Sequence, residues 1–158
     1  MNATAPFVPT SIRIFPLSHI ETTQPQPNKP SRPVVVLHLE LKDAYGDAAK
    51  ALGRLQVTLG RTASGLDPSL EQQELRWDVS ELLEPESNAA LFDPATRTYR
   101  IQLDAPAWVL ETIEGTTRNG RTIPPGAVRV RVAFALGTRS QIKETEPIFL
   151  TDEFLLQK

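Results

Sequence analysis

The sequence predicts an all-β protein that folds as a single two-sheet antiparallel β-sandwich of the immunoglobulin-like type, with seven to nine strands. Short stretches in which apolar and polar residues alternate recur along the chain, and this is the pattern of half-buried strands. Fourteen prolines and eight glycines punctuate the chain, as turns do between short strands. Strands with one apolar face need a second sheet to cover that face, and two packed antiparallel sheets provide it.

Length and composition are those of one domain spanning residues 1–158. A chain of this size buries enough surface to fold without staples. It has no cysteine, which excludes disulfides, thiolate metal sites and cysteine nucleophiles. Its 17 Lys and Arg nearly balance its 19 Asp and Glu, so it lacks the basic character of a nucleic-acid-binding domain. No apolar run approaches the ~20 residues of a membrane-spanning helix, and we expect a soluble chain.

The first elements are a flexible N-terminus, a strand and a connector. Residues 1–9 are expected to be flexible. Ile12 and Ile14 then share one face of a strand that Pro16 ends. Residues 19–33 are polar and rich in proline, which predicts an extended, solvated connector.

Two longer strands follow, joined by the acidic turn "DAYGDAAKAL". We expect Gly46 to supply a positive φ and Asp43 to supply local hydrogen bonds. The residues expected to face the core are Val35, Leu37, Leu39 and Leu41 of the first strand and Leu55, Val57 and Leu59 of the second.

The middle of the chain predicts two strands around a short helical segment. In "QELRWDVS", Trp77 is in phase with two aliphatic residues and is expected in the core. The segment 80–91 is expected to form one or two helical turns, with Ser80 as N-cap and Pro85 limiting its length. In "TYRIQL", the expected core residues are Tyr99, Ile101 and Leu103.

The last third is expected to contain one short strand, one loop and two longer strands. "PAWVLETI" predicts a short strand around Trp108, and the polar flanks of Asn119-Gly120 predict a mobile loop tip. "AVRVRVAFALG" is the clearest strand in the chain. "PIFLTDEFLL" places Ile148 in an apolar row that Asp152 interrupts.

Aspartates at the expected strand ends are the candidate metal ligands. Asp43 and Asp47 would bind calcium if Asp67, Asp93 or Asp104 came close, because calcium takes six to eight oxygen ligands, often from several loops. The alternative is that these aspartates serve only as turn residues, since their side chains bond nearby backbone amides.

Other side chains suggest ligand or partner surfaces. Trp108 is the candidate for stacking on a carbohydrate, and His19 and His38 are expected on the surface. Five arginines are expected to point outward, either as a basic stripe or in cross-strand ion pairs: Arg76, Arg97, Arg100, Arg129 and Arg131.

The stretch "LELKDAYGDAAKALGRLQVTL" resembles the strand–turn–strand unit of bacterial immunoglobulin-like domains. The order of "VVVLHLELKDAYGDAAKALGRLQVTL", "LRWDVSELL", "TYRIQL" and "VRVRVAFAL" resembles that in a group of planctomycete envelope proteins or lipoproteins, over roughly residues 10–155. This resemblance implies a β-sandwich and a location in the cell envelope. It implies no activity and no catalytic residues.

The sequence therefore predicts a non-enzymatic β-sandwich that binds another protein or takes part in assembly. Neither a nucleophile elbow nor a glycine-rich phosphate loop occurs, and we expect no cofactor. The alternative is a ligand-binding sandwich that holds calcium or carbohydrate with loops at one end. Location remains open between the envelope and the cytoplasm, and so does the oligomeric state.

Overall fold

The structure is a computed structural model, and it describes residues 8–62, 71–144, 146 and 148–157. Strands make up 52% of the described residues and helices 17%, which confirms the all-β class. The described part contains eleven strands, more than the seven to nine expected. None of its helices has the length and apolar character needed to cross a membrane.

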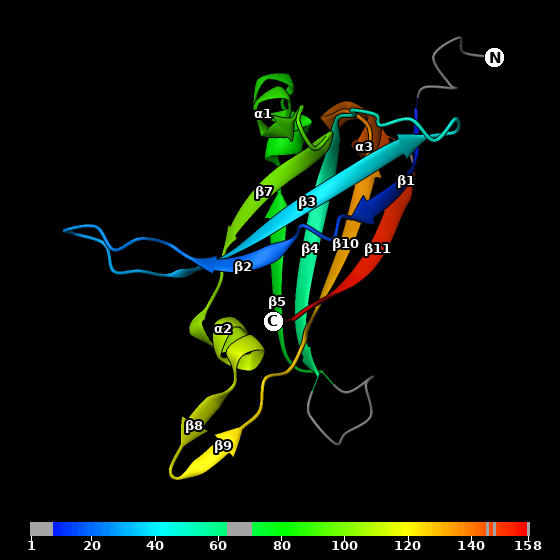
Figure 1. The fold of residues 1–158 in the computed structure, drawn as a ribbon. Coiled ribbons are helices and arrows are strands. Elements are labelled where there is room, and N and C mark those ends of the chain that lie inside the picture. Colours follow the sequence, from blue (N-terminus) through cyan, green and yellow to red (C-terminus); the bar gives the residue numbers. More distant parts are fainter. Residues whose placement is uncertain (1–7, 63–70, 145, 147, 158) are drawn as a thin grey trace.

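The first main sheet has five strands and is antiparallel. It comprises β1 (Pro9–Ile14), β2 (His19–Thr22), β3 (Pro33–Asp43), β6 (Phe92–Asp93) and β7 (Thr98–Asp104). The order is β1-β3-β7-β6, and β2 also pairs with β3. β3 is therefore the central strand. The acidic turn that begins at Asp43 lies at its C-terminal end (Figure 1).

The second main sheet has four antiparallel strands in the order β11-β10-β4-β5. These are β4 (Gly53–Thr62), β5 (Glu71–Val79), β10 (Val128–Leu136) and β11 (Phe149–Leu156). Every other residue of β10, from Val128 to Phe134, is buried, as its alternation predicts.

Both sheets contribute to one hydrophobic core. The expected core residues of β3, β4 and β7 are among its members, and so are the buried residues of β10. Trp77 is partly buried against this core rather than inside it. Ile148 departs from the prediction, because it precedes β11 and is 69% exposed.

The proline-rich segment 19–33 is not a simple connector, contrary to expectation. Its first four residues form β2, which pairs with β3. Gln26 and Lys29 exchange backbone hydrogen bonds of 2.9 and 3.0 Å around the turn at Pro27 and Asn28. The segment is therefore a hairpin arm that projects from the sheet (Figure 1). Of the segment expected to be flexible, residues 1–7 lie outside the described residues, and Pro9 belongs to β1.

The helical segment near 80–91 is confirmed, as the 3₁₀-helix η2 (Glu81–Leu83) followed by α1 (Pro85–Leu91). Glu84 separates them in an extended conformation, because the proline after it disfavours the helical region. The expected cap is wrong in one respect: the Ser80 side chain makes no capping hydrogen bond.

A second helix replaces the strand expected around Trp108. α2 (Ala107–Glu114) begins after Pro106 and ends at Gly115, whose φ is 81°. Val109 and Ile113, four positions apart, are buried, so the apolar residues follow a helical period. α2 packs against β3 and β10 and lies at one end of the two sheets (Figure 1).

Two further short elements differ from expectation. The loop tip expected around Asn119-Gly120 is a hairpin of β8 (Thr116–Arg118) and β9 (Arg121–Ile123). Asn119 and Gly120 both have positive φ, as a two-residue hairpin turn requires, even though its flanks are polar. α3 (Arg139–Glu144) was not expected. Thr138 and Gln141 exchange hydrogen bonds at its start, which is the capping-box arrangement.

Candidate functional site

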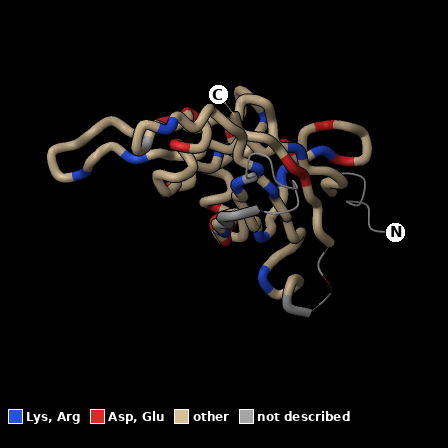
Figure 2. Tube along the Cα trace, turned by 90° about the horizontal axis from the view of Figure 1, so that it is seen from below, with Lys and Arg blue, Asp and Glu red and all other residues tan. Residues whose placement is uncertain are grey.

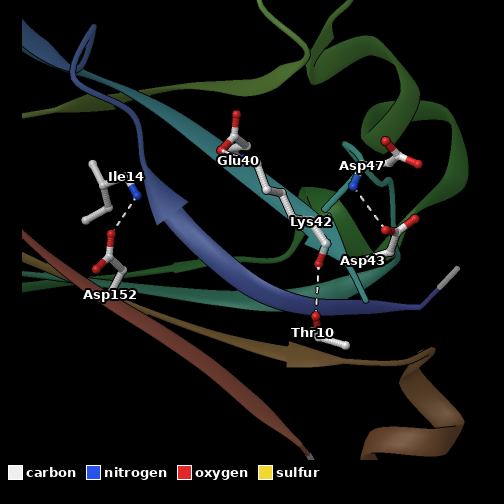
Figure 3. Close-up of polar contacts among 7 residues, drawn as sticks. All are labelled: Thr10, Ile14, Glu40, Lys42, Asp43, Asp47 and Asp152. Carbon is white, nitrogen blue, oxygen red and sulfur yellow. Dashed lines mark hydrogen bonds and ion pairs between the residues drawn. The ribbon is translucent and has the colours of Figure 1, made fainter. Parts of the chain in front are cut away.

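The acidic turn after β3 is organised by its first aspartate. Asp43 is 8% exposed, and its Oδ1 accepts hydrogen bonds from the backbone N–H groups of Tyr45 (2.9 Å) and Asp47 (3.1 Å). Gly46 has a φ of 82°. Figure 3 shows Asp43 turned toward the backbone of Asp47. The turn chemistry predicted for Asp43 and Gly46 is confirmed.

The other candidate calcium ligands do not join this turn in the described part of the chain. Asp104 pairs with Val34, at the opposite end of β3, roughly 30 Å along the strand from Asp43. Asp93 organises a turn of its own, accepting from the N–H of Ala95 at 2.9 Å. Asp67 lies outside the described residues. Within them, no group of three or more acidic or histidine side chains is placed to hold a metal ion, so calcium binding stays a prediction.

Trp108, the candidate for carbohydrate stacking, lies in the first turn of α2. Its side chain is partly buried against the core, and its carbonyl accepts a hydrogen bond of 2.6 Å from Thr112 Oγ1. The ring is therefore only in part accessible. Carbohydrate binding by Trp108 also stays a prediction.

The two histidines lie in different environments. His19 is exposed, and hydrogen bonds to the Leu17 carbonyl (2.8 Å) and to Glu21 (3.0 Å) raise its pKa. His38 is only 7% exposed, so its expected place on the surface is wrong. Burial, followed by the charge of Arg100, lowers the pKa of His38. Its Nδ1 lies 3.2 Å from Thr98 Oγ1.

β3 is buried on both faces over much of its length, which explains the environment of His38. Val36 also lies on the face away from the core, and it is fully buried. His19 of β2 and Gln102 of β7 flank Val36 in register. Long side chains thus stand on both sides of Val36, on a face that the alternation of the sequence assigns to solvent.

The five arginines expected to point outward do not form one stripe. Arg100 belongs to the five-stranded sheet, and Arg97 lies in the turn before β7. Arg76, Arg129 and Arg131 lie on the four-stranded sheet, on the face that points away from the core. There, Arg76 and Arg131 both pair in register with Thr58. Acidic and basic positions are interspersed in Figure 2.

Ion pairs between strands account for part of the charge on this outer face. Arg131 Nε lies 3.2 Å from Glu153 Oε1, and Arg54 Nη2 lies 3.5 Å from Asp78 Oδ1. These side chains are 40–63% exposed, and exposed pairs of this kind contribute little to stability.

The outer face of the four-stranded sheet also exposes large apolar side chains. Phe149 and Leu155 of β11 are 55% and 49% exposed. Leu155 pairs in register with Arg129. Between Phe149 and Leu155 lies a shallow hollow of about 610 Å³ over the centre of the sheet. It is lined in part by Thr58, Ala133 and Thr151. We call this surface of β11, β10, β4 and β5 the outer face.

A buried polar network that the sequence did not predict lies behind the start of β4. Tyr99 OH donates to Asn88 Oδ1 (2.8 Å) and accepts from the Ala51 N–H (3.2 Å). Asn88 Nδ2 donates to the carbonyls of Ala51 (2.8 Å) and Leu82 (2.9 Å). The network joins α1, η2 and β7 to the segment before β4. In the sequence, its one sign was an asparagine, Asn88, within the short segment expected to be helical.

Comparisons with known proteins do not extend this description. No family model, no curated protein and no solved structure matches the chain.

Proposed function

We propose that this protein is a non-enzymatic binding module that holds another protein against its outer face. The observation that carries the proposal is the exposure of Phe149 and Leu155 beside Arg129 and Arg131 on one sheet face. Aromatic and arginine side chains are enriched where proteins contact each other. Small side chains at the centre of this face leave room for a partner's side chains.

The proposal extends to fold family and location. Two antiparallel sheets around one core are compatible with an immunoglobulin-like sandwich, a fold that serves many binding proteins. We place the protein in a bacterial cell envelope only because its sequence motifs resemble those of planctomycete envelope proteins.

The proposal is tested by capture from a native bacterial envelope extract, followed by affinity measurement with the purified partner. Truncating Phe149 and Leu155 to serine should weaken binding at least tenfold, because truncation of apolar anchors at an interface costs more than about 1.4 kcal/mol. The matched control is Ile123→Ser, which removes a side chain of 42% exposure from the distant β8–β9 hairpin. Equal affinities of all three proteins would refute the proposed face, and hydrolytic turnover that depends on one carboxylate would refute a non-enzymatic module.

The alternative function is binding of calcium through Asp43 and Asp47, or of carbohydrate through Trp108. Calorimetry with calcium and a glycan-binding screen test the two ligands separately. Saturable binding that is lost on replacing these residues would favour the alternative over the proposed module.

A further inference from the structure

β7 has an open edge along most of its length. On the side away from β3, β6 pairs only with Tyr99 and Thr98. From Arg100 to Asp104, the described residues give β7 no strand partner on that side. An unpaired edge presents backbone N–H and C=O groups that are complementary to another extended strand.

The hydrogen-bond pattern identifies which residues present these groups. The Ala105 N–H donates to the Pro33 carbonyl at 3.0 Å, so Ala105 is in a hydrogen-bonded position opposite β3. Because such positions alternate along an antiparallel pair, Tyr99, Ile101 and Leu103 also bond to β3. The backbone groups of the intervening residues therefore point to the open edge: Arg100, Gln102 and Asp104.

The charges along this edge are complementary to those of the same edge in a second, antiparallel copy. Arg100 and Asp104 stand two positions on either side of Gln102, and all three side chains are exposed. If a second β7 paired antiparallel with the first about a twofold axis at Gln102, each Arg100 would face the Asp104 of the other copy. Opposite charges directly across an antiparallel pair are stabilising, and a twofold axis repeats the favourable pair.

The surroundings of the edge fit a pairing of this length. At one end β6 occupies the positions beside Tyr99 and Thr98, and at the other Pro106 leads the chain away into α2. A hollow of about 430 Å³, lined in part by Leu91, Phe92 and Arg100, leaves space beside the edge.

The present partner of Asp104 does not prevent this pairing. Asp104 Oδ1 lies 3.0 Å from Arg32 Nε, but both side chains are more than half exposed. An ion pair of this kind contributes little stability, and a carboxylate has acceptor sites for a second donor.

We propose that the protein forms a twofold-symmetric dimer through its β7 edges, with Gln102 facing Gln102 of the second copy. The pairing joins two five-stranded sheets into one continuous sheet. It uses a different sheet from the outer face, so failure of either proposal leaves the other in place.

Cysteine cross-linking tests the register directly, because the natural chain contains no cysteine. Gln102→Cys would place two thiols on opposed residues, about 5.5 Å apart between Cα atoms, which suits a disulfide. Under mild oxidation we expect most of this variant to migrate as a covalent dimer. The control, Thr151→Cys, has its cysteine at an exposed position on the other sheet. Equal cross-linking of both variants would overturn the proposal.

Sedimentation velocity over a series of concentrations tests the contacts. Gln102→Pro should abolish the dimer while leaving the chain folded, because the N–H that it removes points to the open edge and not to β3. Arg100→Asp alone should weaken the dimer, since it places two acidic residues opposite each other. The double variant Arg100→Asp with Asp104→Arg should restore it. A wild-type protein that stays monomeric throughout, or a dimer that none of these variants weakens, would refute the proposal.

Discussion

Asp152 of β11 accepts a hydrogen bond from the backbone N–H of Ile14 in β1, at 2.8 Å. The two strands belong to different sheets, and this bond joins the sheets along one side (Figure 3). It explains why an acidic residue interrupts the apolar row of β11. The carboxylate satisfies an N–H on the side of β1 where none of the described strands pairs with it.

Removing the Asp152 carboxylate should destabilise the fold. We expect Asp152→Ala to lower the free energy of unfolding by about 1.5 kcal/mol, because it leaves the Ile14 N–H without its charged acceptor. Urea unfolding measures the loss. Glu153→Ala is the control, because it removes only an exposed partner of Arg131 and should cost less than about 0.5 kcal/mol. Equal losses in the two variants would contradict a structural role for Asp152.

The Tyr99 hydroxyl should contribute more to stability than an ordinary surface hydroxyl. Tyr99 is 1% exposed, and Tyr99→Phe leaves Asn88 Oδ1 and the Ala51 N–H without their partner. We expect a loss of about 2 kcal/mol, the cost of unsatisfied buried groups. The same substitution at Tyr45, which is 69% exposed, should have a much smaller effect on the thermal midpoint.

The turn after β3 should depend on the conformation of Gly46 and not on space around it. Apart from Gly46 and its two chain neighbours, no described atom lies within 4 Å of the position of an added Cβ, but φ is +82°. Gly46→Ala should therefore cost about 1 kcal/mol, and Gly46→Asn should cost less, because asparagine tolerates the left-handed region better. If denaturant unfolding shows that neither substitution lowers the free energy of unfolding, the positive φ of Gly46 does not contribute to stability.

Asp43→Asn separates the turn role of Asp43 from calcium binding. The amide keeps an oxygen that can accept from Tyr45 and Asp47, so stability should change little. Calcium affinity, if present, should fall because a charged ligand is lost. If the alternative function holds, isothermal titration with calcium shows saturable heat for the wild type only. Absence of heat in both proteins would leave Asp43 as a turn residue alone.

His38 should make the protein less stable in mild acid. Burial lowers the pKa of His38 below its usual 6.5, so below that pH the unfolded chain binds a proton that the folded chain resists. Stability is therefore fully present above the unfolded pKa and is lost as pH falls toward the folded pKa. His19 acts in the opposite sense, because its pKa is raised and protonation favours the folded state.

Urea unfolding between about pH 8 and pH 5 distinguishes the two histidines. His38→Gln should reduce the loss of stability in acid, and His19→Gln should increase it. An acid profile that His38→Gln does not change would contradict the buried, neutral state of His38.

Periodicity in the sequence determined the long strands and their core faces. Val128 to Phe134 and Leu55 to Leu59 alternate without interruption, and each residue of these rows is buried as predicted. Local turn chemistry was equally readable at Asp43 and Gly46, because both act through their own backbone neighbours. The prediction of a strand in place of the helix α2 was wrong. The helix has eight residues with only two buried positions at helical spacing, so its periodicity is a weak signal.

Tertiary structure alone decided which residues meet. The sequence placed His38 on a polar face, but in the fold it is buried and lies against Thr98 and Ser18. Asp152 meets Ile14, and Tyr99 meets Asn88, across separations that no local pattern encodes. The self-complementary edge of β7 also depends on strand order, because within the described residues the short β6 leaves Arg100 to Asp104 without a strand partner on that side. Local patterns determine strands and turns; contacts between distant residues require the folded chain.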